Sequence, residues 1–256
     1  MVGVVEHGNS AVLVTLAANG KLLDRRRVDL TDGLPTHPHH HEGSWAVGRY
    51  LDSPWAKPTS LTDAIALVER VRVAAGQGAE RALEMLAQSV AVPVASIALR
   101  ECPELPATTE ERIRDNRAQT YADTVMYRQA LAEAARARDW TVRWYDRERV
   151  FEQASVAVAQ DDIQSFLTAM GRAVGPPWQA QHKLAAAAAL VIALGNSFGL
   201  EQPTAWRFRV EEVSAGVYRA SGVDAQGRSV SATGTDPNRA LSDCRAYAER
   251  VGDITK

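Results

Sequence analysis

The segment at residues 37–42 is the densest group of metal-binding side-chain types in the sequence. It contains His37, His39, His40, His41 and Glu42. Imidazole nitrogens bind zinc, nickel and iron, and a carboxylate can complete such a site. Because neighbouring residues of an extended chain point to opposite sides, only two or three of these side chains can meet one ion. The segment predicts a transition-metal site, zinc included, that uses His39, His40 and His41; the alternative is an exposed polar loop.

A second group, at residues 138–149, interleaves basic and aromatic side chains. Its members are Arg138, Trp140, Arg143, Trp144, Tyr145, Arg147 and Arg149. Aromatic rings stack on bases and guanidinium groups neutralise phosphates, so the pattern makes Arg143 and Arg147 candidates for phosphate binding. A strand with its aromatic residues in the core and its arginines in solvent gives the same pattern, and that is the simpler interpretation.

Several familiar kinds of site have no support in the sequence. The chain has two cysteines, Cys102 and Cys244, which excludes a disulfide framework and a cysteine-based zinc site and fits a reducing compartment. Cys102 follows an apolar run, a setting typical of an inert thiol. No phosphate-binding glycine loop, His-Glu-x-x-His or Gly-x-Ser-x-Gly motif occurs. The common nucleotide-binding and serine-hydrolase functions therefore lack local support.

Composition places the chain among ordinary globular proteins. Its 29 Lys and Arg against 31 Asp and Glu give a net charge of −2, without the basic excess that non-specific binders of nucleic acid or anionic membranes carry. The longest apolar run, residues 184–194, is too short to span a bilayer. The first ten residues contain no basic segment, so we expect no signal peptide. These features predict a cytoplasmic protein that does not enter membranes.

The sequence pattern predicts mixed strands and helices up to about residue 195. Residues 4–16 lead into Asn19-Gly20, a strong hairpin signal, and a second strand at 21–30 is expected to pair back. Further predicted elements are a strand at 44–51, a helix from Ser60 broken near Gly76 and Gly78, a buried strand at 92–99, a long helix at 108–138, a strand at 141–145, a helix from Asp162, and a last helix at 179–194 that stops at Gly195-Asn196.

The C-terminal part has a different pattern. Strands are predicted at 206–213, 217–223 and 228–233, with a hairpin loop at 224–227 and a helix at 240–251. A change in composition at 200–204 separates two domains, 1–200 and 204–256. The second is so small that we expect Val210, Val217 and Val223 to form an apolar face, which packs on the larger domain or on a second subunit in a homo-oligomer.

The order of elements over residues 1 to about 195 resembles the ribonuclease H-like fold, and within it the RuvC-type Holliday-junction resolvases. Three stretches carry the resemblance. Residues 4–10 look like the first strand of that family, with an acid shortly before a glycine; residues 144–150 look like the end of its fifth strand; and residues 179–194 are similar to its last helix. The fold class implied is α/β, a mixed sheet flanked by helices, followed here by a small βββα domain.

The resemblance also implies a site. In that family, carboxylates from the first strand, the fourth strand and the last helix bind divalent metals, Mg or Mn, that activate water on a phosphodiester. Glu6 matches the first acid and Glu101 the second, but the acidic positions of the last helix fall on Ala185 and Ala188. His182 lies one helical turn before Ala185, so we expect it to replace the missing ligand and Lys183 to contact phosphate, with His39, His40 and His41 as accessory ligands.

Three functions remain open at this point. The first is a divalent-metal-dependent nuclease, or another nucleic-acid-processing protein, in which Glu6, Glu101 and His182 converge. The second is a catalytically inactive binding or assembly protein of the same fold, which accounts better for Ala185 and Ala188 and for the nearly neutral charge. The third is an actin-like nucleotide-binding protein, which shares the core but would need phosphate-binding glycine loops.

Overall fold

The computed structural model describes residues 1–54, 56–194, 207–214, 216–223 and 229–253. The chain divides into two compact units, Met1–Phe198 and Gly199–Lys256, and each is considered by itself. The predicted helix stop at Gly195-Asn196, the domain boundary at 200–204 and the hairpin loop at 224–227 lie outside the described residues.

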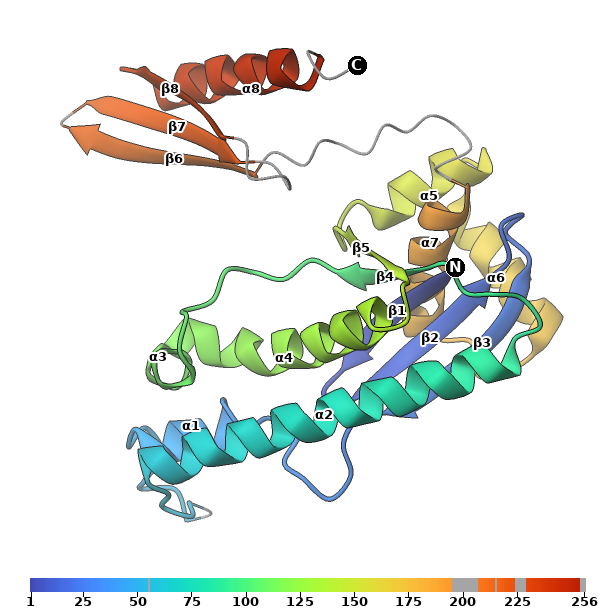
Figure 1. Cartoon of the computed structure of the whole chain (residues 1–256), viewed down its shortest axis with the longest axis horizontal. Helices are drawn as coiled ribbons and strands as arrows, with labels where there is room; N and C mark the ends of the chain where they lie inside the picture. The colour runs from blue at the N-terminus through green and yellow to red at the C-terminus, as the bar shows by residue number, and fades with distance from the viewer. Residues whose placement is uncertain (55, 195–206, 215, 224–228, 254–256) are drawn as a thin grey trace. The chain divides into compact units, whose positions relative to one another are not determined.

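A five-stranded mixed sheet forms the centre of the first unit (Figure 1). Strands β1 (Val2–His7), β2 (Ser10–Leu16) and β3 (Leu22–Asp29) form an antiparallel meander. Strand β4 (Ser96–Arg100) pairs parallel with β1, and β5 (Thr141–Tyr145) pairs parallel with β4. The resulting order, β3-β2-β1-β4-β5, is that of the ribonuclease H-like fold. The predicted fold class is confirmed.

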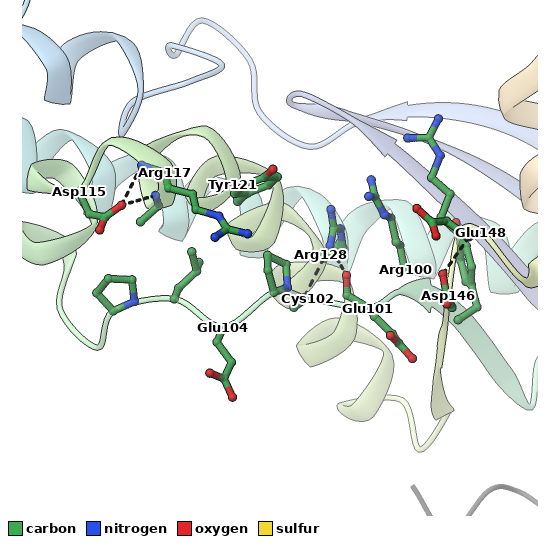
Figure 2. A pocket seen from close by; sticks show the side chains of 16 residues that line it. Arg100, Glu101, Cys102, Glu104, Asp115, Arg117, Tyr121, Arg128, Asp146 and Glu148 are labelled. Carbon is green, nitrogen blue, oxygen red and sulfur yellow. Dashed lines mark hydrogen bonds between the residues drawn. The ribbon is translucent and has the colours of Figure 1, made fainter. Parts of the chain in front are cut away.

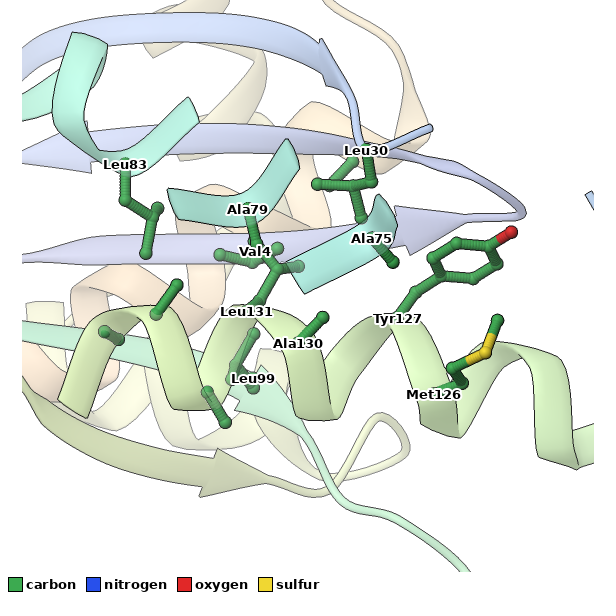
Figure 3. Close-up of a cluster of buried hydrophobic side chains, with 14 of the residues drawn as sticks. Val4, Leu30, Ala75, Ala79, Leu83, Leu99, Met126, Tyr127, Ala130 and Leu131 are labelled. Atoms are coloured by element: carbon green, nitrogen blue, oxygen red, sulfur yellow. The ribbon is translucent and has the colours of Figure 1, made fainter. Parts of the chain in front are cut away.

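Helices cover both faces of this sheet. The helices of this unit are α1 (His41–Ala46), α2 (Leu61–Ser89), α3 (Thr109–Arg114), α4 (Asn116–Arg136), α5 (Val150–Val158), α6 (Ile163–Val174) and α7 (Ala180–Leu194). Of these, α1 and α3 pack mainly against α2, α4 and each other. One core lies between the sheet and helices α2 and α4, where Val4, Leu99 and Leu131 meet (Figure 3). The other lies between the sheet and helices α5 to α7. Because side chains alternate along a strand, Val2 and Val4 face α2 and α4, whereas Val5 packs in the core of α7.

Two glycines allow helices to approach backbone closely. A Cβ at Gly3 would lie 1.8 Å from the carbonyl oxygen of Ala185, so α7 lies directly on β1. A Cβ at Gly78 would lie 1.9 Å from the carbonyl oxygen of Leu30. These contacts explain why α2 continues through Gly78 from Leu61 to Ser89, where the sequence predicts a break: packing against the chain after β3 outweighs the low helix propensity of glycine.

Three other predictions about elements are corrected, and one helix was missed. Residues 4–16 belong to two strands, because Gly8, at a φ of 55°, turns the chain between β1 and β2. Residues 44–51 form the end of α1 and turns instead of a strand. The long helix predicted at 108–138 is divided, because Asp115 leaves the helical conformation and its carboxylate caps α4. Helix α5 was not predicted.

The second unit is a three-stranded antiparallel sheet with one helix. It consists of β6 (Arg207–Ser214), β7 (Val217–Val223), β8 (Ser229–Gly234) and α8 (Pro237–Asp253). Its small core contains Ala220, Ala240 and Cys244, with Val210 packed against them. Val210 pairs with Ala220 and so shares its face, whereas Val217 alternates onto the other face. The predicted apolar face is therefore divided, and its Val210 side packs in the core that α8 helps to form.

No helix in the described part of the chain is both long enough and apolar enough to cross a membrane.

Candidate functional site: a groove at the carboxyl edge of the sheet

A groove of about 900 Å³ lies where β4 and β5 end. Three segments line it: the end of β4 with the extended chain after it, α4 from its cap at Asp115 to Arg128, and the end of β5 with the turn after it (Figure 2). The lining residues are Arg100, Glu101, Cys102, Pro103, Glu104, Leu105, Pro106, Asp115, Arg117, Ala118, Tyr121, Arg128, Tyr145, Asp146, Arg147 and Glu148. Ligands of open α/β sheets bind outside the carboxyl ends of parallel strands. We call this feature the carboxyl-edge groove.

A buried ion pair joins the groove to the first strand. The Arg128 Nε donates to Glu6 Oε1 at 2.6 Å, and the two side chains are only 3% and 5% exposed. The same guanidinium donates from Nη1 to the backbone carbonyl oxygen of Glu101, also at 2.6 Å. Arg128 thus connects the ends of β1 and β4 with a fixed positive charge, at the place where the resemblance implies a metal ion.

Helix α4 presents one face to the groove. Arg117, Tyr121 and Arg128 follow one another at spacings of four and seven residues, which places them on one side of a helix with 3.6 residues per turn. The side-chain carboxylate of Asp115 accepts the backbone N–H groups of Arg117 and Ala118 at 2.8 and 2.7 Å. This cap fixes the first turn of α4, and with it the side chains at that end of the groove.

Three arginines in the groove keep their guanidinium groups available. Within the described residues, the side chains of Arg100, Arg117 and Arg147 make no hydrogen bond or ion pair. Two of the acidic lining residues are already engaged, because Asp115 caps α4 and Asp146 accepts the backbone N–H of Glu148 at 2.8 Å.

Two further carboxylates do not compete for these guanidinium groups. Glu101 and Glu104 are exposed, and their side chains point away from α4 (Figure 2). On its α4 side the groove therefore offers the unpaired guanidinium of Arg117, and Glu148 is a further carboxylate of the lining.

Burial raises the pKa of two groups of the groove, the Tyr145 phenol and the Cys102 thiol. The Tyr145 hydroxyl donates to the carbonyl oxygen of Val4 at 2.9 Å, and burial raises the pKa of this phenol, with the nearby Glu6 adding to the shift. Burial also raises the pKa of the Cys102 thiol, whereas Arg128 opposes that shift. A thiol with a raised pKa is a poor nucleophile, which agrees with the inert role expected for Cys102.

The structure does not bring the three predicted ligands together. Glu6 faces α4, whereas His182 belongs to α7, which packs on the opposite face of the sheet. His182 is buried, stacks on Trp178 with ring centroids 5.7 Å apart and accepts the backbone N–H of Gln179 at 3.2 Å. Burial lowers its pKa, and the charge of Arg25 adds to that effect. The backbone carbonyl oxygen of Glu101 shares the Arg128 guanidinium with the Glu6 carboxylate, but the carboxylate of Glu101 is exposed.

The predicted phosphate contacts are separated as well. Arg147 lines the groove. Arg143 lies on β5 and is not among the lining residues, and Lys183 donates to the Thr168 hydroxyl at 2.8 Å, between α6 and α7. Of the three, only Arg147 has a place in this site.

The residues present do not fit a divalent metal at the groove. The Glu6 carboxylate is bound by Arg128, and Ala185 and Ala188 are fully buried against the sheet. Across the described ranges, no group of three or more His, Cys, Asp or Glu side chains is arranged to hold a metal ion.

The histidine segment is attached to the other side of α4. Asp123 accepts the backbone N–H groups of His39 and His40, at 3.0 and 3.2 Å, and its Oδ1 lies 2.8 Å from His39 Nδ1. His39 and Asp123 are both buried. At about 100° per residue, Asp123 lies roughly 160° around the helix from Tyr121 and roughly 120° from Arg117. The segment therefore does not face the carboxyl-edge groove.

Within that segment the remaining histidines are close together. The ring centroids of His37 and His41 lie 5.5 Å apart, and those of His40 and His41 lie 5.3 Å apart. Burial lowers the pKa of His37, while Asp123 acts in the opposite direction. His39 Nε2, His40 Nδ1 and Glu42 Oε2 are buried without a hydrogen-bond partner.

Sequence reasoning missed the three α4 residues that define the groove. None of Arg117, Tyr121 and Arg128 is among the site residues that the sequence predicts. Their spacing of four and seven residues could have indicated that they share one face of a helix. The partner of Arg128 was not predictable by spacing, because Glu6 lies 122 positions away in the sequence.

Comparisons with known proteins find similarity among solved structures. No protein-family profile matches the chain, and no curated protein matches it in sequence. Among solved structures, it is similar to Thermus thermophilus RuvC in complex with a Holliday junction substrate, at 16% identity and a TM-score of 0.43, over 77% of this chain and 94% of that one. It is also similar to another structure of Thermus thermophilus RuvC, at 14% identity and a TM-score of 0.38, over 77% and 95%. The fold assignment rests on the strand order and helix placement of this chain.

Proposed function

We propose that this chain is a ribonuclease H-like protein that binds nucleic acid in the carboxyl-edge groove without metal-dependent cleavage. The observation that carries the proposal is the Arg128 guanidinium, which lies between the Glu6 carboxylate and the Glu101 carbonyl oxygen. This fixed cation neutralises an acid that would otherwise repel phosphate. The Arg128 guanidinium also binds Glu6 Oε1, a carboxylate oxygen that a metal ion at this site would need.

The groove has the chemistry for binding a sugar-phosphate backbone. Arg100, Arg117 and Arg147 offer guanidinium groups without competing partners in the described chain. Arginine binds phosphate through short, charge-assisted and often paired hydrogen bonds. Because the arginines come from β4, α4 and the turn after β5, they hold successive phosphates from more than one side.

The competing function is metal-dependent phosphodiester cleavage, with Mg or Mn at Glu6 and Glu101. It would require Arg128 to release Glu6 and Glu101 to turn into the groove. The last helix would still supply Ala185 and Ala188 where that chemistry requires acids. The contacts of the present structure favour binding over cleavage.

A binding and cleavage assay on one labelled DNA tests the proposal. The probe is a hairpin with a single-stranded tail, so that it offers both paired and unpaired nucleotides. We expect the Arg100→Ala/Arg117→Ala/Arg147→Ala variant to bind at least tenfold more weakly, and the slope of log K against log salt to fall by about 2. The matched control is Arg81→Ala, an exposed arginine on α2 outside the groove.

We expect no cleavage product with Mg²⁺ or Mn²⁺. Cleavage that depends on metal and disappears in Glu6→Gln would establish the nuclease instead. Equal weakening by the triple variant and by Arg81→Ala would place binding outside the groove and contradict the proposal.

A further inference from the structure

We infer that the carboxyl-edge groove accepts an unpaired strand of nucleic acid, with a base stacked on Tyr121 and the adjoining phosphate bound by Arg117. This inference rests on the proposed function and specifies which form of nucleic acid the groove takes. The juxtaposition that carries it is an exposed aromatic ring, one helical turn from an unpaired guanidinium, opposite an apolar wall.

Tyr121 is a ring without an evident structural role. The residue is 44% exposed, it belongs to neither hydrophobic core, and within the described residues its side chain makes no hydrogen bond or ring contact. The neighbouring tyrosine of the same helix shows the contrast: Tyr127 is fully buried, and its hydroxyl donates to the carbonyl oxygen of Thr36 at 3.0 Å. Tyr121 instead lines the groove.

Arg117 lies four residues before Tyr121 on α4, a spacing that puts two side chains next to each other on one helix face. The Asp115 cap fixes the turn that carries Arg117. A guanidinium beside an aromatic ring matches the repeat of a single strand, in which each base is joined to a phosphate. Combined stacking and phosphate contact is the usual way proteins bind unpaired strands.

The facing wall of the groove suits a flat base. It is the extended chain after β4, which contributes Pro103, Leu105 and Pro106 to the lining. Within the described residues, that chain makes one backbone hydrogen bond to the sheet, from Glu101 N to the carbonyl oxygen of Tyr145. A base that enters from solvent has a ring on one side and apolar side chains on the other.

A duplex cannot use these contacts. In a duplex, the faces of the bases are covered by neighbouring bases, so an aromatic side chain can stack only on a base that has left the helix. The arginines alone would bind either form through phosphate. Tyr121 therefore supplies the preference for unpaired nucleotides, and the arginines supply the affinity common to both forms.

The test compares a labelled 12-nucleotide strand, as DNA and as RNA, with the same strand annealed to its complement. We expect the full-length protein to bind the single strand at least tenfold more tightly than the duplex. Tyr121→Leu should weaken single-strand binding about tenfold and leave duplex binding unchanged. Tyr121→Phe should bind as the wild type does. The matched control is Tyr50→Leu, which removes another exposed tyrosine of the same unit, outside the groove.

The outcomes separate this inference from the proposed function. Equal or tighter binding of the duplex, or a Tyr121→Leu variant that binds the single strand as the wild type does, overturns the inference while the arginine-dependent binding stands. If neither probe binds, both fail. Because Tyr121 is exposed, a melting curve of Tyr121→Leu that matches the wild type shows that any loss of binding is local.

Discussion

Arg128 and Glu6 are the residues whose contacts decide what this site can do. Removing two opposite charges from water is costly, and their attraction repays that cost only with good geometry and additional hydrogen bonds. Here the guanidinium has both, since it binds the Glu6 carboxylate and the Glu101 carbonyl oxygen at 2.6 Å each. The pair fixes α4 relative to the ends of β1 and β4. The walls of the groove at β4 and α4 are held in place by the same contacts.

Breaking this pair from one side should be far more harmful than removing both partners. Arg128→Met leaves a carboxylate buried without its cation, and we expect a loss of about 3–5 kcal/mol in the free energy of unfolding. Glu6→Gln/Arg128→Met should recover most of that loss. Urea unfolding of the two single variants and the double variant measures it. The control is Arg72→Met, which breaks an exposed pair with Glu69 and should cost less than about 1 kcal/mol. Additive effects of the two single changes would contradict the expected coupling.

A transition metal at the histidine segment stays a prediction. Neutral imidazole coordinates metals, so zinc binding by His40 and His41 should raise the melting temperature and should weaken as pH falls through about 6 to 7. The comparison is thermal unfolding with and without Zn²⁺ for the wild type and for His40→Ala/His41→Ala, which leaves the contact between His39 and Asp123 in place. A zinc shift of equal size in both proteins would show that His40 and His41 do not bind the metal.

At the scale of elements, tertiary contacts decide where helices continue. Helix α2 contains Gly76 and Gly78, and it passes through both. A Cβ at Gly76 would meet nothing within 4 Å, whereas one at Gly78 would collide with the backbone of Leu30. Close packing therefore requires a glycine at position 78, whereas nothing in the surroundings of position 76 requires one.

Alanine at these two positions should change stability in opposite directions. Gly76→Ala should stabilise the protein by about 0.5–1 kcal/mol, because alanine has the higher helix propensity. Gly78→Ala should destabilise it, because the clash with Leu30 moves α2 away from the sheet and outweighs the same gain. Thermal and urea unfolding of the two variants side by side checks this. Stabilisation by both changes would show that α2 shifts without cost.

Helix α4 joins the two candidate sites of the first unit. One face presents Arg117 and Tyr121 to the groove, and the other presents Asp123 to the histidine segment. Both sites thus depend on the same helix, although their residues alternate along its sequence.

At the scale of the whole molecule, the groove belongs entirely to the first unit. Every lining residue lies between Arg100 and Glu148, within Met1–Phe198. The second unit has a small core, with Ala220, Ala240 and Cys244 fully buried and a few partly buried neighbours. Self-association through this unit stays a prediction.

Separating the units should therefore have unequal effects. We expect a fragment of residues 1–198 to keep the melting temperature and the single-strand affinity of the full chain within error. A fragment of residues 204–256 should show no cooperative unfolding as a monomer, because so small a core cannot offset the entropy of ordering the chain. Calorimetry and binding of both fragments measure this. A large loss of affinity in the first fragment would show that the second unit contributes to the site.

The sequence determined the parts of this protein that local patterning controls. Apolar runs indicated where the sheet strands lie, with β1 and β2 predicted as one; Thr108 with Glu111 indicated a helix start, and the succession of elements indicated the ribonuclease H-like class. Tertiary structure decided what depends on residues far apart in the chain. Whether α2 continues at Gly78 depended on Leu30, and whether Glu6 is available depended on Arg128. Likewise, His182 was separated from Glu6 because α4 and α7 cover opposite faces of the sheet, a difference that no spacing within one segment encodes.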